Sequence, residues 1–383
     1  IRINQQSYFE ALCLNSLAQF RNLKVLGLND NFIESFGSDE SIFRCIPGLE
    51  SLRLDSNCLS SVKTTHLEDT SRLRELFLSR NKLSSLDRDL FRAQSTFLKH
   101  LYLSDNQLTR LNECTFHNLR CLFSLDLSHN KLSMLPYFAF KDLQSLTNLF
   151  LESNELTEIN ELVFVDLKKL KTLCLNHNRI AWLHRDAFKS CTSLVDHYLH
   201  ANRIERINSK LFAQQKNLRR LYLNENRLSK IPNGALRELR GLRFLGLSSN
   251  RLVDINQHVF KDAASLEELW LSDNAIQRVD EWAFKSLFLL ERLILSRNRL
   301  RELAFDLFKP LAQLKELWLH DNPLDYGSVS ANYKQIFRNL SELYILSISF
   351  VHVNESIKSD EQIKSIRENH KKLRFFSIDF YSK

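Results

Sequence analysis

Glycine and proline are scarce in this sequence, with seven and five residues in a chain of 383. It also lacks a long stretch rich in proline, serine and glycine, the composition that marks linkers between domains. One continuous array is therefore favoured over several globular domains, despite the length. No apolar run approaches the length that a membrane-spanning helix needs, which excludes such a helix from this sequence.

Motifs of catalysis and of cofactor binding are absent as well. The sequence has no glycine-rich phosphate loop, no His-Glu-x-x-His motif and no Cys-x-x-Cys motif. We therefore expect no enzymatic activity, no cofactor and no metal site. The seven cysteines are an odd number without the spacing of a disulfide framework, and taken alone they allow a cytosolic protein.

The dominant feature that is present is a short repeat of constant length. Each copy follows the phrase Leu-x-x-Leu-x-Leu-x-x-Asn-x-(Leu/Ile), as in residues 218–228. Ten of the twelve intervals between successive Asn positions equal the step from Asn202 to Asn226, and such a period indicates a stacked array whose units contact mainly their neighbours. The Asn residues are Asn31, Asn57, Asn81, Asn106, Asn130, Asn154, Asn178, Asn202, Asn226, Asn250, Asn274, Asn298 and Asn322.

The Leu-x-Leu part of each copy predicts a short strand. Leu221 and Leu223 point to one side of that strand and Tyr222 to the other, because side chains alternate along a strand. Stacked copies then form a parallel sheet with the leucines inward. Each Asn is expected to bond backbone groups of its own turn and of the next coil, which satisfies buried polar groups.

From Asn81 to Asn298, the return half of the repeats carries a phenylalanine ten residues after the Asn, and Leu236 is the break in this run. We expect the rings to stack into an apolar spine on the convex side, because a large planar ring fills the gap between convex segments. The spine positions are Phe91, Phe116, Phe140, Phe164, Phe188, Phe212, Phe260, Phe284 and Phe308.

With both signatures the chain resembles the leucine-rich repeat family, in its extracellular class of 24-residue repeats with a phenylalanine spine. Residues 23–324 carry the resemblance. It implies an α/β solenoid of horseshoe shape, with a parallel β-sheet on the concave face and turns or short helices on the convex face. The family includes Toll-type receptor ectodomains, chaoptin-like adhesion proteins and hormone-receptor ectodomains, and no motif in this chain selects one of them.

The repeat pattern divides the chain into three segments. Residues 1–22 are interpreted as a degenerate repeat or a truncated N-terminal cap, residues 23–324 as thirteen repeats, and residues 325–383 as degenerate C-terminal repeats. A helix is expected near 360–370, where Ser359 and Gln362 form a capping box. The missing Met start and the missing cysteine-rich caps indicate a mature form or a fragment.

The resemblance places the protein outside the cell, secreted or attached to a membrane through parts outside this sequence. Asn339 and Asn354 lie in Asn-x-Ser sequons and are the candidate glycosylation sites. Cys191 takes a position that leucine holds in other copies, so we expect it to be buried. Cys114 and Cys121 flank one convex segment, where they either pair or stay apart.

The net charge is +8, and much of the excess directly follows the Asn positions. One interpretation is a solvated rim, and the other is an anionic partner such as a sulfated glycan, an acidic protein or a nucleic acid. Arg219 and Arg220 are followed by Glu267 and Glu268, and this change of sign favours a protein partner over a uniform polyanion such as nucleic acid. The rim residues are Lys82, Lys131, Arg179, Arg203, Arg227, Arg251 and Arg299.

His197 and His200 resemble a pair of metal ligands but are not one, because in a strand their side chains face opposite sides. His197 takes the inward place that leucine holds in the other twelve copies. It is either a tolerated, partly hydrated substitution or a local point of weakness that responds to pH.

The outward position between the two inward leucines is aromatic in seven of thirteen copies. Exposed rings in a row are typical of binding hot spots, although neighbouring rings can instead stack and stiffen the sheet. The flanking column of small serines leaves the rings accessible. The candidate partner-binding residues are Phe77, Tyr102, Phe150, Tyr198, Tyr222, Trp270 and Trp318, with Arg219, Arg220, Glu267 and Glu268 beside them.

These features together predict a non-enzymatic extracellular recognition module that binds a protein ligand or co-receptor through its concave face. One alternative is a structural adhesion or matrix protein whose repeats associate with copies of themselves. A second alternative is an intracellular scaffold, which a glycan on either sequon would contradict.

Overall fold

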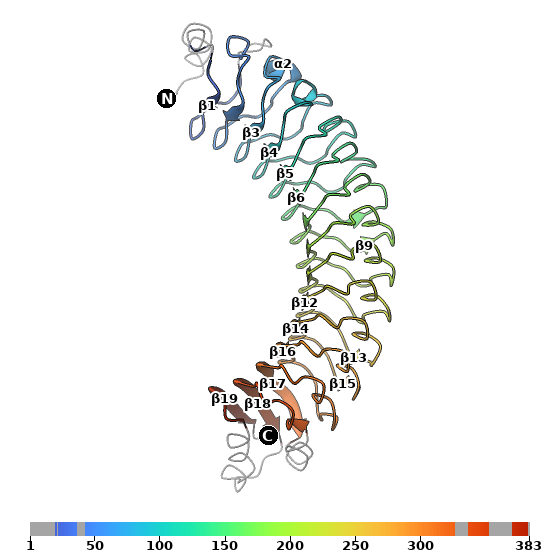
Figure 1. Ribbon diagram of the computed structural model, residues 1–383. Helices are drawn as coiled ribbons and strands as arrows, with labels where there is room; N and C mark the ends of the chain where they lie inside the picture. Colours follow the sequence, from blue (N-terminus) through green and yellow to red (C-terminus); the bar gives the residue numbers. More distant parts are fainter. Residues whose placement is uncertain (1–19, 21, 37–42, 326–335, 352–369, 382–383) are drawn as a thin grey trace. The chain divides into compact units, whose positions relative to one another are not determined.

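The computed structural model describes residues 20, 22–36, 43–325, 336–351 and 370–381, and it divides into two compact units, residues 1–194 and 195–383. Each unit is a parallel β-solenoid in which successive coils contribute one short strand to a sheet (Figure 1). The expectation of a solenoid with a parallel sheet is confirmed. Within each unit the strands line the inner side of the coils and the turns lie on the outer side (Figure 1).

The strands of the first unit pair in chain order, and the helices among its described residues are short, namely α2 (Thr64–Leu67) and η2 (Arg92–Gln94). A small separate sheet joins β7 (Glu158–Ile159) to β9 (Trp182–Leu183). The strands of the main sheet are β1 (Val25–Gly27), β2 (Ser51–Arg53), β3 (Glu75–Phe77), β4 (His100–Tyr102), β5 (Ser124–Asp126), β6 (Asn148–Phe150) and β8 (Thr172–Cys174).

The second unit repeats this arrangement, with a small sheet formed by β13 (Asp254–Ile255) and β15 (Arg278–Val279). Its last three strands are longer than the others. The main sheet contains β10 (Asp196–Tyr198), β11 (Arg220–Tyr222), β12 (Phe244–Gly246), β14 (Glu268–Trp270), β16 (Arg292–Ile294), β17 (Glu316–Asp325), β18 (Ile345–Val351) and β19 (Phe375–Tyr381).

The core consists of the leucine rows and the phenylalanine spine. Leu221, Leu245 and Leu269 stand in register on successive strands and are almost completely buried. All nine predicted spine phenylalanines are fully buried. From Phe91 to Phe188, neighbouring ring centroids lie 5.9–6.1 Å apart with nearly parallel planes, so the rings stack along the solenoid.

Each strand ends in a turn that combines a left-handed residue with the repeated Asn. The residue before every one of the thirteen Asn positions has φ between 53° and 56°, although none of them is glycine. In the turn of Asn250, Nδ2 donates to the carbonyl of Leu247 at 3.0 Å and to that of Leu223 at 2.9 Å, while Oδ1 accepts from the amide of Leu228 at 3.0 Å. Leu223 and Leu228 belong to the preceding coil, so the Asn bonds backward along the array rather than to the next coil.

Replacing Asn250 with alanine is expected to lower the free energy of unfolding by about 1–3 kcal/mol, because it leaves the buried amide of Leu228 without its acceptor. The matched control is Arg251→Ala, which removes an exposed side chain next to it and is expected to change stability by less than about 0.5 kcal/mol. Chemical denaturation of both variants measures the difference. Equal losses would show that the Asn side chain does not hold neighbouring coils together.

The C-terminal strands continue the leucine phrase at a longer interval. Leu317 pairs in register with Leu346, and Leu346 pairs with Phe376; both of these steps along the chain are longer than the step from Leu293 to Leu317. The helix expected near 360–370, the sequon at Asn354 and nearly all of residues 1–22 lie outside the described residues. Among the residues that are described, no helix is long and apolar enough to cross a membrane.

Four cysteines bear on the sequence expectations. Cys191 is fully buried, as predicted, and burial raises the pKa of its thiol to about 12. Cys174 stands at an outward strand position, in register with Phe150, and is also buried. Cys114 and Cys121 are both free thiols, so these two stay apart.

Candidate binding face

The aromatic column lies on the sheet face that points away from the leucine core, with three rings in the first unit and four in the second. Every one of these rings is half-buried. The rings are therefore less exposed than expected, because neighbouring aromatic side chains partly cover most of them. The rings concerned are Phe77, Tyr102 and Phe150, and Tyr198, Tyr222, Trp270 and Trp318.

In the first unit the stacking begins at Arg53, whose guanidinium lies 4.6 Å from the centroid of the Phe77 ring. Phe77 and Tyr102 stack with centroids 4.7 Å apart and planes at 15°. His100 then links Tyr102 to Phe123, whose side chain is 44% exposed. These side chains of the first unit therefore form one row of ring contacts rather than isolated rings.

In the second unit, Tyr198 and Tyr222 stack with centroids 4.6 Å apart and planes at 9°. Phe244 continues the row, 4.5 Å from Tyr222 and 4.8 Å from Trp270, which it meets edge to face. Sequence reasoning missed Phe244, because it stands one residue before the inward leucine and not in the outward column. The signal was present: Gly246 leaves the outward position of this strand empty, and a large ring beside it fills the gap.

Gly246 is required by the close packing of a neighbouring coil. A Cβ atom at this position would lie 2.5 Å from the side-chain nitrogen of Asn224. Asn224 is held there because its Oδ1 accepts a hydrogen bond from the amide of Ser248 at 2.9 Å. Any larger residue at position 246 would displace Asn224, so the gap in the aromatic column is built into the turn.

Beyond this gap the concave face is hollowed between Trp270 and Trp318, with Ile294 between them in the register. The two indoles differ in their hydrogen bonding. Trp318 Nε1 donates to Glu316 Oε2 at 3.3 Å, whereas Trp270 Nε1 is buried and has no acceptor among the described residues. The floor and walls of the hollow are formed by Asn224, Glu225, Ser248, Ser249, Trp270, Ser272, Ile294, Ser296, Arg297, Trp318 and His320.

The charged residues beside the rings are largely neutralised by partners one coil away. Arg220 Nη2 donates to Asp196 Oδ2 at 2.8 Å, and this hydrogen bond raises the pKa of Arg220. Glu267 forms an ion pair with Arg243, with 3.1 Å between Oε1 and Nη1. Among the described residues, Arg219 has no ion-pair partner.

Glu268 belongs to a longer ion network. Arg292 lies between Glu268, at 3.0 Å, and Glu316, at 2.7 Å. Burial favours the protonated form of Glu316, but hydrogen bonds from Arg292, Tyr344 and Trp318 outweigh it and lower the pKa of this carboxyl. Arg220, Glu267 and Glu268 of the expected charge block are thus members of interleaved ion pairs between adjacent coils.

The paired histidines do not form a metal site. His197 is fully buried among the inward residues, and its ring meets Phe212 edge to face. His200 lies on the opposite side, near the rings of Tyr198 and Tyr222. Over the described part of the chain, no group of three or more His, Cys, Asp or Glu side chains could hold a metal ion.

The other predicted surface residues lie apart from the hollow. All seven rim cations are exposed, and Arg179 and Arg227 pair with Glu155 and Glu205. Asn339 is half-buried, and its Nδ2 donates to the carbonyl of Lys309 at 2.9 Å. A glycan on Asn339 would replace one of the two hydrogens on this nitrogen, and glycosylation there stays a prediction.

Comparison with known proteins identifies the repeats. The family model described as "Leucine rich repeat" matches eight overlapping segments that together cover residues 21–324. Mouse podocan is 34% identical over 122 residues, which is 31% of this chain and 19% of podocan. The matched parts span less than two-fifths of the length of each curated relative.

Two solved structures resemble the whole fold. A leucine-rich repeat protein of Leptospira interrogans has a TM-score of 0.75 at 26% identity, over 94% of this chain and 86% of that one. Toll in its glycosylated complex with Spatzle, from Drosophila, has a TM-score of 0.76 at 22% identity, over 96% of this chain and 49% of that one. Similarity at this level of identity establishes the shared solenoid.

Proposed function

We propose that this chain, which belongs to the leucine-rich repeat family, is a non-enzymatic extracellular module, secreted or at the cell surface. It binds a protein ligand or co-receptor on the strand face of its second unit. The observation that carries this proposal is the hollow between Trp270 and Trp318, which is floored by serines and flanked by neutralised charge.

Three properties of the hollow support a protein partner. Two half-buried indoles and Ile294 offer apolar area that an inserted side chain would cover, and Trp is among the residues most enriched in hot spots. The surrounding ion pairs form a polar rim, which is the usual anatomy of an interface. The unsatisfied N–H of Trp270 would gain an acceptor if a small rotation of the ring brought it to a partner carbonyl.

Extended strand surfaces in repeat proteins serve as binding faces, because the solenoid presents side chains from many coils on one side. The structure of Toll with Spatzle is one case in which a protein of similar fold is held in a complex. The partner of this chain is inferred only as a class. On the strand face of the first unit, Phe77, Tyr102 and Phe150 are proposed as further partner contacts.

The proposal is tested with tryptophan variants on both sides of the solenoid. Immobilised parent chain is screened against a panel of purified secreted and cell-surface proteins, and the hits are measured against Trp270→Ala and Trp318→Ala. Each variant is expected to lose at least about 2 kcal/mol of affinity, or about 30-fold, as buried aromatic anchors do. The matched control is Trp282→Ala, which removes an indole that is 42% exposed and lies outside the hollow.

Thermal melts of the three variants separate loss of binding from loss of folding. If Trp282→Ala weakens binding while the other two variants bind normally, the hollow is not the binding site. If the parent chain binds only to itself, as sedimentation in dilute solution would reveal, the adhesion alternative replaces the receptor class.

A further inference from the structure

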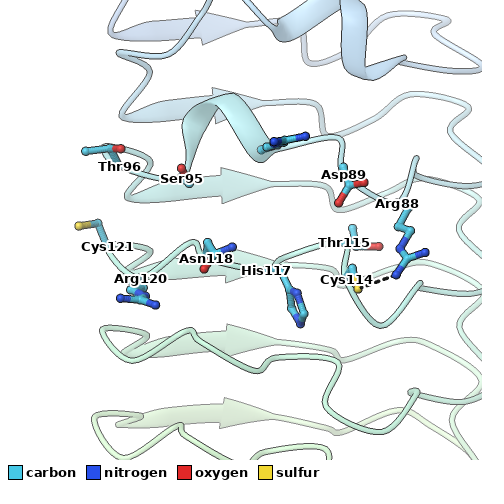
Figure 2. A pocket seen from close by; sticks show the side chains of 11 residues that line it. Arg88, Asp89, Ser95, Thr96, Cys114, Thr115, His117, Asn118, Arg120 and Cys121 are labelled. Atoms are coloured by element: carbon cyan, nitrogen blue, oxygen red, sulfur yellow. Dashed lines mark hydrogen bonds between the residues drawn. The ribbon is translucent and has the colours of Figure 1, made fainter.

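A second pocket lies in the first unit, away from the strand face. Two successive return segments form it, residues 88–96 after β3 and residues 114–121 after β4, and they face each other across neighbouring coils (Figure 2). Arginine, serine, threonine, asparagine and cysteine side chains of these two segments line it. None of them belongs to the proposed protein-binding face.

The pocket concentrates positive charge, which the nearby carboxylates of Asp89 and Glu113 offset only at Arg88. Arg88, Arg92 and Arg120 are all exposed, and Asp89 is the one carboxylate among the lining residues. None of the three guanidinium groups forms an ion pair with a described residue. The strand face differs, since arginines there are held by carboxylates of adjacent coils. Unpaired cations that line a concave site raise the local concentration of anions.

The cations are spread along the pocket rather than gathered at one point. Figure 2 shows Arg88 beside Cys114 at one end and Arg120 beside Cys121 at the other. Arg88 is held in place because its Nη2 donates to Cys114 Sγ at 3.5 Å, and Arg92 is carried on the short helix η2. A ligand with a single anionic group would reach one end only, so the spacing favours an elongated ligand with several anionic groups.

The remaining lining side chains favour a sulfated sugar over a nucleic acid. Ser95, Thr96 and Asn118 supply hydroxyl and amide groups that suit the hydroxyls of a sugar. Proteins that hold single-stranded nucleic acid stack the bases on aromatic side chains. His117 is the one ring that lines this pocket, so it has no platform for successive bases.

We propose that this pocket binds a sulfated oligosaccharide, with Arg88, Arg92 and Arg120 each contacting sulfate groups. Guanidinium groups suit this role, because their planar N–H pairs match the oxygens of tetrahedral anions. The site is separate from the proposed protein-binding face. It would be the place where an anionic partner, one interpretation of the net charge, binds.

The test compares two triple variants that remove the same charge. Arg88→Gln/Arg92→Gln/Arg120→Gln empties the pocket of its cations, and Arg203→Gln/Arg251→Gln/Arg299→Gln removes three exposed cations of the rim. Calorimetry measures binding of a fully sulfated heparin-derived hexasaccharide and of its desulfated counterpart. The pocket variant is expected to bind the sulfated sugar about 30-fold more weakly at low salt. The slope of its log affinity against log salt concentration should fall by an amount that corresponds to about two lost sulfate contacts. The rim variant should bind like the parent.

Two outcomes of this comparison would overturn the proposal. One is loss of binding in the rim variant with normal binding in the pocket variant, which would place the anion on the rim. The other is equal or tighter binding of a single-stranded oligonucleotide that the pocket variant abolishes, since that would assign the pocket to another class of polyanion. Thermal melts confirm that both triple variants are folded.

The two pocket thiols provide a readout in the unaltered chain. Cys114 and Cys121 are free and line opposite ends of the pocket, whereas Cys58 is a free thiol outside it. With the sulfated hexasaccharide at ten times its dissociation constant, alkylation by iodoacetamide should slow by up to about tenfold at Cys114 and Cys121 and stay constant at Cys58. Binding without protection of Cys114 and Cys121 would contradict the assignment to this pocket.

Discussion

Replacing Phe140 with alanine is expected to lower the free energy of unfolding by about 3–5 kcal/mol, the usual cost of deleting a buried phenylalanine ring. Phe140 is fully buried, and its ring stacks between Phe116 at 6.1 Å and Phe164 at 6.0 Å. The deletion would therefore open a cavity that touches both neighbouring coils. Chemical denaturation of the variant and the parent measures the loss.

The chain supplies its own control for this experiment. Leu236 occupies the spine position of its repeat and is 2% exposed, so an aliphatic side chain is tolerated there. Phe140→Leu should accordingly cost only about 1 kcal/mol. Because each coil of a solenoid contacts mainly its neighbours, hydrogen exchange should accelerate in the coils next to Phe140 and remain unchanged far along the array. A uniform loss of protection would contradict this picture of local coupling.

The repeated part of the fold could be predicted from the sequence because the same spacing of leucine and asparagine recurs in thirteen copies. Leucines at a fixed spacing predict the inward rows, and the phenylalanine of each return segment predicts the spine, and both are observed. The direction of the Asn bonds could not be predicted in the same way. An Asn in a turn has the same sequence signal whether it bonds the preceding coil or the following one.

The binding face was predicted less well, because it depends on contacts between side chains of different coils. The gap at Gly246 follows from the approach of Asn224, and no periodic pattern shows that distance. Phe244 then fills the space beside the gap and covers parts of Tyr222 and Trp270. Rings that look exposed in an alternating strand pattern are consequently half-buried.

The ion pairs, in contrast, could have been found in the sequence. Asp196 and Arg220 hold the same strand position in successive repeats, as do Glu268, Arg292 and Glu316. Opposite charges at equivalent positions of adjacent repeats lie side by side in a parallel sheet, and each pair is observed. Comparing charges along each column, rather than along the chain, would have predicted a neutralised face.

Replacing His197 with leucine is expected to stabilise the protein, and to do so more strongly at acid pH. His197 is fully buried at an inward position that pairs in register with Leu221, and burial lowers the pKa of its imidazole from 6.5 to about 3. The folded state therefore holds this ring neutral at pH values where the unfolded chain takes up a proton. The stability of the parent chain is full above pH 6.5 and is lost as the pH falls towards 3.

The size of the effect follows from the two pKa values. At pH 4.5 the proton taken up by the unfolded chain costs the parent on the order of 2–3 kcal/mol, and leucine removes that cost together with the burial of a polar ring. Urea denaturation of parent and variant at pH 7.5 and 4.5 measures the difference, in which carboxylates common to both chains cancel. The control is His258→Gln, which removes an exposed rather than a buried histidine. If His197→Leu and the parent show the same pH dependence, the imidazole takes up its proton inside the folded coil, and the buried position of His197 is not what limits stability in acid.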